Sequence, residues 1–166
     1  MLRFAGNHDL AMDEKDRVVF PLALRKCVDE DERESVLAAG FMVRPSDTNE
    51  YLEMFPRDEY DRYIESLEAR YSPEDELGQS YLRFFTSRVE PVDLDRQFRF
   101  AIPESAKVAA SLGKDLVFVG RTRKIEIWPR ESWQNWQKQH GERKVPAATA
   151  GPPPVARGGE TGAAGR

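Results

Sequence analysis

Two copies of one short motif hold the residues of this chain that are best suited to bind an anion. Residues 13–21 read DEKDRVVFP and residues 95–103 read DRQFRFAIP, so Asp-x-x-x-Arg-x-x-x-Pro occurs twice in the chain. Arginine has a fixed planar guanidinium that can bind two acceptor atoms of a phosphate or a guanine at once. The aspartate four positions earlier could hold that guanidinium in position. The motif therefore indicates a turn that presents Arg17 and Arg99 to a phosphate or a guanine.

A simpler interpretation of the motif stays open. Asp and Arg on either side of a turn can pair with each other, and Asp also accepts backbone N–H bonds in turns. An exposed ion pair of this kind contributes only about 0–1 kcal/mol to stability. The spacing alone supports a structural role for Asp13, Arg17, Asp95 and Arg99 as well as it supports a binding role.

A second pair of matching segments follows the two motifs. Residues 51–60 read YLEMFPRDEY and residues 124–133 read KIEIWPRESW, so an aromatic-Pro-Arg triplet also occurs twice, once after each motif. Two landmarks in the same order, separated by segments of similar type, indicate one duplicated unit. We therefore expect repeats at residues 1–70 and 89–140, joined by a linking helix at 71–88.

Each half is predicted to run strand, turn, strand, helix, strand, strand, helix, which gives an α+β fold. The first half should have strands ending near Met12 and at 17–20, 36–43 and 51–55, a loop over the acidic run 29–34, and a helix from Pro56 with an apolar face of Tyr60, Tyr63, Ile64 and Leu67. The second half should have strands at 89–92, 99–102, 116–119 and 125–128, a helix at 103–111 capped by Gly113, and a helix from Pro129.

The two remaining segments have distinct signals. The linking helix should begin at the capping-box-like segment 72–75 and carry Leu77, Tyr81, Phe84 and Phe85. Residues 141–166 are rich in Gly, Ala and Pro and have almost no large apolar side chains, which predicts a disordered tail.

Composition narrows the class of protein. With one cysteine and two histidines among 166 residues, we expect no disulfide, no metal site and no cofactor. No Ser/His/Asp arrangement, Cys/His pair or glycine-rich phosphate loop occurs, so we do not expect an enzyme. No stretch reaches the roughly 18 apolar residues of a membrane helix, and residues 1–15 lack the apolar core of a signal peptide. A cytoplasmic location is expected.

Charge is unevenly distributed along the chain. The formal net charge is −4, and residues 1–70 alone contain 10 Lys/Arg and 17 Asp/Glu. The acidic total argues mildly against a protein that coats nucleic acid without selectivity. The second half could still carry a local basic face, formed by Arg96, Arg99, Arg121, Arg123 and Lys124.

Several features occur in one order along the chain. A glycine and hydrophobic residues near the N-terminus precede His-x-Leu-x-x-Asp-x-Lys-x-Arg-x-x-x-Pro, which runs from His8 to Pro21. The second Asp-x-x-x-Arg-x-x-x-Pro follows in the other half of the chain, and then the Glu-x-Trp of Glu126 to Trp128. In this order the features resemble the MraZ family, over about residues 3–137.

The resemblance implies a bacterial transcriptional regulator of the division and cell-wall gene cluster. It implies two AbrB-like (SpoVT-AbrB) repeats, each contributing to a swapped-hairpin β-barrel with short helices. The expected partners are double-stranded DNA upstream of its own operon, bound at short direct repeats, and further copies of the chain in a ring, at the nucleoid in the cytoplasm. No membrane and no small-molecule cofactor are expected. The DNA-binding residues that the resemblance implies are Asp13, Arg17, Asp95 and Arg99, and we also expect Lys15 and Arg96, which lie in the same two motifs, to contribute to DNA binding.

The sequence departs from this family at the residue before each motif arginine, where the family usually has glycine. Here these residues are Asp16 and Phe98. Glycine adopts a positive φ at no steric cost, whereas phenylalanine would be strained there. Either the turn has a different shape, or Phe98 is exposed for a base or partner contact. Asp16 also adds negative charge beside Arg17, so we expect the second motif to contribute more DNA affinity than the first.

The lost glycines and the acidic first half support a second hypothesis. The chain could be an assembly or interaction protein that keeps the ring and has lost DNA binding. Retention on a heparin or operator-DNA column at low salt would separate the two hypotheses, because an interaction protein should not be retained.

Overall fold

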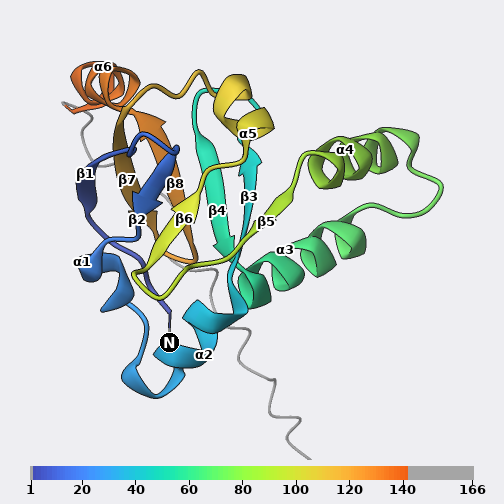
Figure 1. Cartoon of the computed structure of the whole chain (residues 1–166). Coiled ribbons are helices and arrows are strands. Elements are labelled where there is room, and N and C mark those ends of the chain that lie inside the picture. The colour runs from blue at the N-terminus through green and yellow to red at the C-terminus, as the bar shows by residue number, and fades with distance from the viewer. Residues whose placement is uncertain (1, 142–166) are drawn as a thin grey trace, which may run out of the picture.

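The structure, a computed structural model, describes residues 2–141 and has an α+β fold of eight strands and six helices (Figure 1). Residues 142–166, which make up nearly all of the predicted disordered tail, lie outside the described residues. Six strands form one antiparallel sheet in the order β1-β7-β8-β4-β3-β5, and two more form a short antiparallel ribbon.

The elements have the following bounds. The main sheet consists of β1 (Asn7–Ala11), β7 (Asp115–Arg121), β8 (Lys124–Pro129), β4 (Leu52–Pro56), β3 (Phe41–Pro45) and β5 (Glu90–Val92), and the ribbon of β2 (Arg17–Val19) and β6 (Arg99–Ala101). The helices are α1 (Leu22–Arg25), α2 (Glu30–Ala39), α3 (Arg57–Arg70), α4 (Glu76–Ser87), α5 (Glu104–Ala109) and α6 (Arg130–His140). Every predicted strand is present, and only the one expected from Val36 is clearly displaced.

Strand pairing interleaves the two halves of the chain. β1 of the first half pairs with β7 of the second, and β5 of the second half pairs with β3 of the first. β4 pairs with β8 at the centre of the sheet, and β2 pairs with β6 in the ribbon. Exchanging β1 with β5, β3 with β7 and β4 with β8 reverses the strand order, so the sheet has the same order from either edge. Two interleaved copies of one unit would have this pattern, while the AbrB-like barrel and the repeat boundaries remain predictions.

The largest apolar cluster holds the ribbon against the main sheet. Val18 and Phe100, which lie opposite each other in the ribbon, are 1% and 2% exposed. The ring of Phe100 lies 6.2 Å from that of Phe118 in β7, and the ring of Phe20 lies 5.1 Å from that of Phe41 in β3. Full burial of such a side chain contributes about 1.5–3 kcal/mol, so apolar burial fixes the position of the ribbon.

The prediction for residues 29–43 was wrong in part. The acidic run is helical: Glu30, Asp31 and Glu32 form the first turn of α2. Negative side chains at a helix N-terminus stabilise the helix through its dipole. The strand expected from Val36 begins only at Phe41. Gly40 caps the end of α2 with a φ of +77°, which glycine adopts without strain. Its backbone also lies so close to the Val92 carbonyl of β5 that a side chain at this position would clash.

Two predicted helix caps were also wrong. Asp75, rather than Ser72, caps α4, since its Oδ1 accepts a hydrogen bond from the Gly78 backbone N–H at 2.9 Å. The end of α5 is capped at Ala110, and Ser111, with a φ of +51°, takes the left-handed conformation that was expected of Gly113. None of the helices between residues 2 and 141 is long and apolar enough to cross a membrane.

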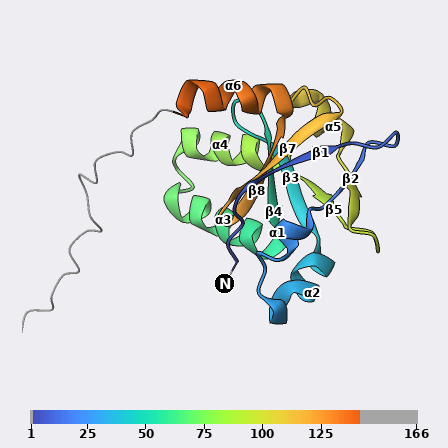
Figure 2. The ribbon, with the colours of Figure 1, turned by 90° about the vertical axis from the view of Figure 1, so that its left-hand side faces the viewer.

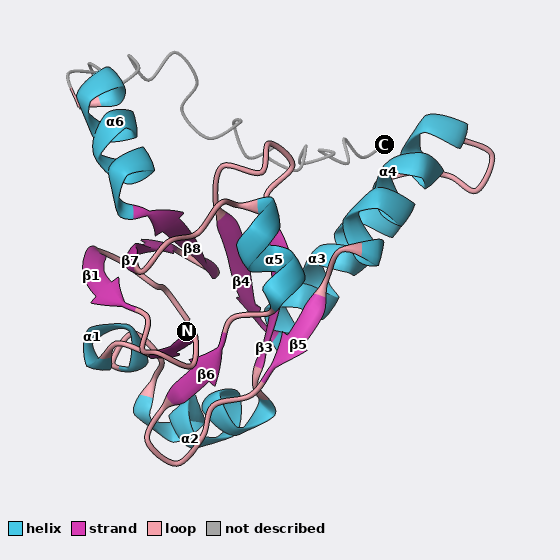
Figure 3. Ribbon diagram, turned by 45° about the horizontal axis from the view of Figure 1, so that its top comes forward, coloured by secondary structure: helices cyan, strands magenta, loops and turns pink. Residues whose placement is uncertain are grey.

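Helices α3 and α4 form a hairpin that projects from one side of the sheet (Figures 1 and 3). Its core consists of Phe55, Leu67 and Phe85, with the rings of Tyr60, Tyr63 and Tyr81 packed around Phe85. Leu67 and Phe85 are buried as the predicted apolar faces require, whereas Leu77 is 84% exposed.

A buried arginine connects this hairpin to the sheet. Arg44 of β3 is 2% exposed, and it donates hydrogen bonds of 2.6 Å to Glu53 of β4 and to Asp47. Its guanidinium carbon lies 3.9 Å from the ring centroid of Phe85 in α4. Asp47 in turn accepts a 3.0 Å hydrogen bond from the Tyr81 hydroxyl. Arg44 thus joins β3, β4 and α4 at one point.

Loss of the Arg44 guanidinium should strongly destabilise the protein. Arg44→Ala leaves the 7%-exposed Glu53 without one of its partners, and removing one member of a buried ion pair costs about 3–5 kcal/mol. Urea unfolding followed by circular dichroism measures the loss. Arg83→Ala is the matched control, because Arg83 of α4 is exposed and a surface substitution of this kind should change stability by about 0.5 kcal/mol or less. Equal losses in the two variants would contradict the role of Arg44.

Candidate nucleic-acid interface

Asp13 organises the turn between β1 and β2. Its Oδ1 accepts hydrogen bonds from the backbone N–H groups of Lys15, at 2.8 Å, and Arg17, at 2.9 Å. Its Oδ2 accepts a hydrogen bond from Nε of Arg17 at 2.9 Å. One carboxylate therefore closes the turn and fixes the guanidinium that follows it.

Asp95 makes the same contacts in the turn between β5 and β6. Its Oδ1 accepts from the backbone N–H groups of Gln97, at 2.8 Å, and Arg99, at 2.9 Å, and its Oδ2 accepts from Nε of Arg99 at 2.9 Å. The arginine side chains of the two motifs are each 31% exposed. The ion pair predicted from the spacing is present in both motifs, with the same geometry.

The ribbon places both arginines on one outward face. Arg17 lies opposite Ala101 and Arg99 lies opposite Val19, so the two arginines are diagonal neighbours, and such positions are about 7–8 Å apart. Val19 is 47% exposed, whereas the alternate residues of both strands point into the core. In Figure 2 both motif turns lie on the same side of the molecule, and Figure 1 shows them at opposite ends of the ribbon.

Each arginine keeps its outer edge available. Asp13 and Asp95 contact only Nε, and within residues 2–141 neither terminal nitrogen of Arg17 or Arg99 has a hydrogen-bond partner. Those two nitrogens form the edge of the guanidinium that binds two acceptor atoms side by side. The arrangement can therefore bind a phosphate, or the O6 and N7 atoms of a guanine, through each arginine.

Both explanations offered for the missing glycines were wrong. The turns keep the positive φ that glycine would supply, at +56° for Asp16 and +60° for Phe98. Phe98 is not exposed for a partner, because it is half-buried against the main core and lies under the guanidinium of Arg25, with 3.8 Å from the guanidinium carbon to the ring centroid. The carboxylate of Asp16 pairs with Lys107 at 2.7 Å. The turns thus have one shape despite unlike side chains.

The other basic residues fall into two groups. Lys15 and Arg96 lie exposed in the two motif turns, beside the arginines. The second group lies where β7 meets β8: Arg121 ends β7, Arg123 lies in the turn and Lys124 begins β8. These residues pair with the carboxylates of Glu126 at 2.5 Å, Glu59 at 3.2 Å and Glu53 at 2.5 Å, respectively. The single basic face expected in the second half is therefore not formed, since these three side chains serve ion pairs elsewhere.

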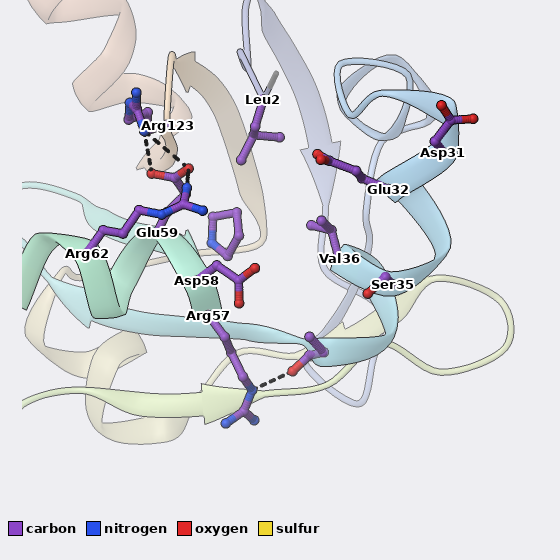
Figure 4. A pocket seen from close by; sticks show the side chains of 12 residues that line it. Leu2, Asp31, Glu32, Ser35, Val36, Arg57, Asp58, Glu59, Arg62 and Arg123 are labelled. Carbon is purple, nitrogen blue, oxygen red and sulfur yellow. Dashed lines mark hydrogen bonds and ion pairs between the residues drawn. The ribbon is translucent and has the colours of Figure 1, made fainter.

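A cavity of about 610 Å³ lies away from both motifs, between α2 and α3. Arg62 and Arg123 reach the buried carboxylate of Glu59 from two sides at its wall (Figure 4). Asp31, Glu32 and Asp58 also line it, so it carries charges of both signs. It contains no motif residue. Within residues 2–141, no group of three or more His, Cys, Asp and Glu side chains is arranged to hold a metal ion.

The protein is an α+β protein that carries two arginines on the outer face of an antiparallel ribbon. Ribbons of this kind can bind in a groove of DNA, so the arrangement is typical of a nucleic-acid-binding protein. The family follows from sequence comparison. Residues 85–150, which include the second motif, match the family model described as "MraZ protein, putative antitoxin-like". The chain is 30% identical over 148 residues to "Transcriptional regulator MraZ" of Mycolicibacterium smegmatis, covering 88% of this chain and 94% of the relative. This chain belongs to the MraZ family.

Other relatives with the same name agree. The protein from Clostridium beijerinckii is 30% identical over 137 residues, which cover 82% of this chain and 89% of the relative. The protein from Clostridium tetani is 27% identical over 133 residues, covering 80% and 86%. The similarity therefore extends over both halves of the described chain.

The two motif aspartates should titrate at lower pH than an unfolded aspartate. The hydrogen bond from the Arg17 backbone N–H is the main cause that lowers the pKa of Asp13, and that from Arg99 does the same for the pKa of Asp95. Because the folded-state pKa is lowered, the stabilisation is present above the unfolded pKa of about 3.9. It is lost as the pH falls through the folded pKa.

Carboxyl-carbon NMR titration tests this assignment. Both carboxyl groups should titrate below about 3.9. Arg17→Ala should raise the pKa of Asp13 only in part, because the backbone N–H bond remains, and should leave that of Asp95 unchanged as an internal control. A full return of the Asp13 pKa to the unfolded value in Arg17→Ala would show that the side-chain pair, not the turn, causes the shift.

Proposed function

We propose that this protein is a sequence-specific DNA-binding transcriptional regulator of the division and cell-wall gene cluster. One observation carries the proposal: Arg17 and Arg99 lie on one face of the β2–β6 ribbon, each held through Nε, and their terminal nitrogens have no hydrogen-bond partner within residues 2–141. The relatives are named as transcriptional regulators, which supports a regulator rather than an enzyme.

The chemistry of recognition follows from the turns. Each guanidinium binds a phosphate or a guanine edge, and the motif aspartate keeps it rigid, so little side-chain entropy is lost on binding. Lys15 and Arg96 add positive charge beside the two arginines. Contacts to phosphates release counterions, so affinity falls as salt concentration rises.

The two motifs should contribute unequally. Residues 13–17 hold three acidic and two basic side chains, whereas residues 95–99 hold one acidic and two basic side chains. The second turn therefore has the more positive charge, and Arg99 should supply more of the DNA affinity than Arg17.

The assembly that we propose is a ring of AbrB-like swapped-hairpin units in the cytoplasm, at the nucleoid. Each subunit binds one short direct repeat weakly, and linked subunits that engage successive repeats together supply the useful affinity. The interleaved strand order of the main sheet supports the swapped arrangement. The expected target is the DNA upstream of the protein's own operon.

An interaction protein without DNA binding is the second candidate, and it is motivated by the absence of both motif glycines together with the acidic first half of the chain. The positive φ at Asp16 and Phe98 removes the first of these reasons, because the turns keep the shape that glycine would allow. The outward face of the ribbon thus favours the DNA-binding proposal.

Fluorescence anisotropy with DNA from upstream of the gene, at two salt concentrations, tests the proposal. Arg99→Ala should weaken binding by about 5- to 150-fold, the range for one bidentate arginine contact. Arg17→Ala should weaken binding by less, and the double variant should bind the upstream DNA no more tightly than it binds unrelated DNA. Arg83→Ala is the control, because it removes one exposed arginine from α4. Equal binding by the wild type and the double variant would overturn the site.

A further inference from the structure

The residue before each motif arginine adopts the left-handed backbone conformation, which costs more free energy for aspartate than for glycine and most for a bulky residue such as phenylalanine. Asp16 and Phe98 have φ values of +56° and +60°, in the left-handed region that favours glycine. A side chain held there needs compensating contacts. Those contacts come from the other half of the chain.

Lys107 of α5 holds the first turn. Its Nζ lies 2.7 Å from Oδ2 of Asp16 and 2.8 Å from Oε2 of Glu104. The Lys107 side chain is 19% exposed, so its ammonium is partly shielded from water. The ion pair with Asp16 raises the pKa of Lys107, which keeps the lysine charged. The turn residue and the lysine are 91 positions apart in the sequence.

Arg25, at the end of α1, holds the second turn. Its guanidinium carbon lies 3.8 Å from the centroid of the Phe98 ring, and its buried Nε has no hydrogen-bond partner within residues 2–141. The Arg25 guanidinium thus makes a cation–π contact with the Phe98 ring, which joins α1 to the second turn.

The two contacts are equivalent by the internal repeat. Arg25 follows the first motif arginine at the same spacing at which Lys107 follows the second, so the two basic residues occupy matching positions in the two halves. Each turn is thus contacted by the basic residue of the helix that follows the other motif. Two backbone hydrogen bonds also join each turn to the other half of the chain. Phe20 N donates to Phe98 O at 2.7 Å, and Ile102 N donates to Asp16 O at 3.3 Å.

We propose that Lys107 and Arg25 are positioning residues for DNA recognition: each holds the turn of the other motif in the conformation that aims its arginine outward. The inference rests on the proposed function. Lys107 has a second effect, because it neutralises the carboxylate of Asp16 beside Arg17, which would otherwise oppose a phosphate. The two basic residues replace the function of the missing turn glycines, and neither contacts DNA.

A double-mutant cycle in the full chain tests the role of Lys107. Lys107→Met should weaken binding to the upstream DNA by about 5- to 20-fold, within the range of coupling between contacting residues. Asp16→Gly should bind at least as tightly as the wild type. The double variant Asp16→Gly/Lys107→Met should bind within about twofold of Asp16→Gly, because glycine needs no partner in this conformation.

Three controls accompany the cycle. Lys107→Arg should retain most of the binding, since it keeps the charge beside Asp16. Lys138→Met removes one exposed lysine from the last turn of α6 and should leave binding unchanged. Thermal unfolding of every variant confirms that it is folded, and Lys107→Gln replaces Lys107→Met if the latter does not fold. Arg25→Met and Phe98→Gly form the corresponding cycle for the second turn.

The possible outcomes separate the positioning role of Lys107 from the proposed DNA-binding function. Loss of binding in the Arg17/Arg99 double variant with wild-type binding by Lys107→Met overturns the positioning role and leaves the proposed function intact. An equal loss for Lys107→Met in the wild-type and Asp16→Gly backgrounds also overturns it, because Lys107 would then act independently of the turn. Absence of DNA binding by the folded wild-type protein overturns the proposed function and this inference together.

Discussion

The antiparallel pairing of β2 with β6 is the interaction on which the candidate site depends. These short strands pair only with each other among the described strands, and an isolated two-stranded ribbon is marginally stable at best. Burial of Val18 and Phe100 against the main sheet supplies the missing stabilisation. Because the pairing joins residues from opposite halves of the chain, it brings Arg17 and Arg99 onto one face, which neither half could do alone.

Electrostatics inside the main sheet determine which basic side chains remain available. Glu53 and Glu126 face each other on β4 and β8, and like charges in opposite positions destabilise a sheet. Arg44 and Lys124 neutralise Glu53, whereas Arg121 and the Trp128 indole N–H, at 2.9 Å, bind Glu126. The basic residues at the β7–β8 turn are therefore engaged in ion pairs within the fold. The ribbon arginines differ, since their aspartates bind only Nε and leave the two terminal nitrogens without a partner within residues 2–141.

Local chemistry allowed much of the fold to be predicted from the sequence. The motif turns were predictable because Asp caps turns through its own carboxylate, and α3 because its apolar residues recur at helical spacing. The acidic start of α2 was misread, since a run of carboxylates suits both a loop and the first turn of a helix. The contacts of Asp16 with Lys107 and of Phe98 with Arg25 depend on how the two halves interleave. Only the matching positions of Arg25 and Lys107 in the two repeats could have suggested them.

The most direct test of the central claim is an NMR titration of the protein with its upstream DNA that follows the arginine Nε–H signals. The account predicts that the signals of Arg17 and Arg99 shift and saturate together as DNA is added. Arg44, which is 2% exposed and held in ion pairs with Glu53 and Asp47, should not respond. Unchanged signals of Arg17 and Arg99 at saturating DNA, with shifts confined to other arginines, would contradict the ribbon as the DNA-binding surface.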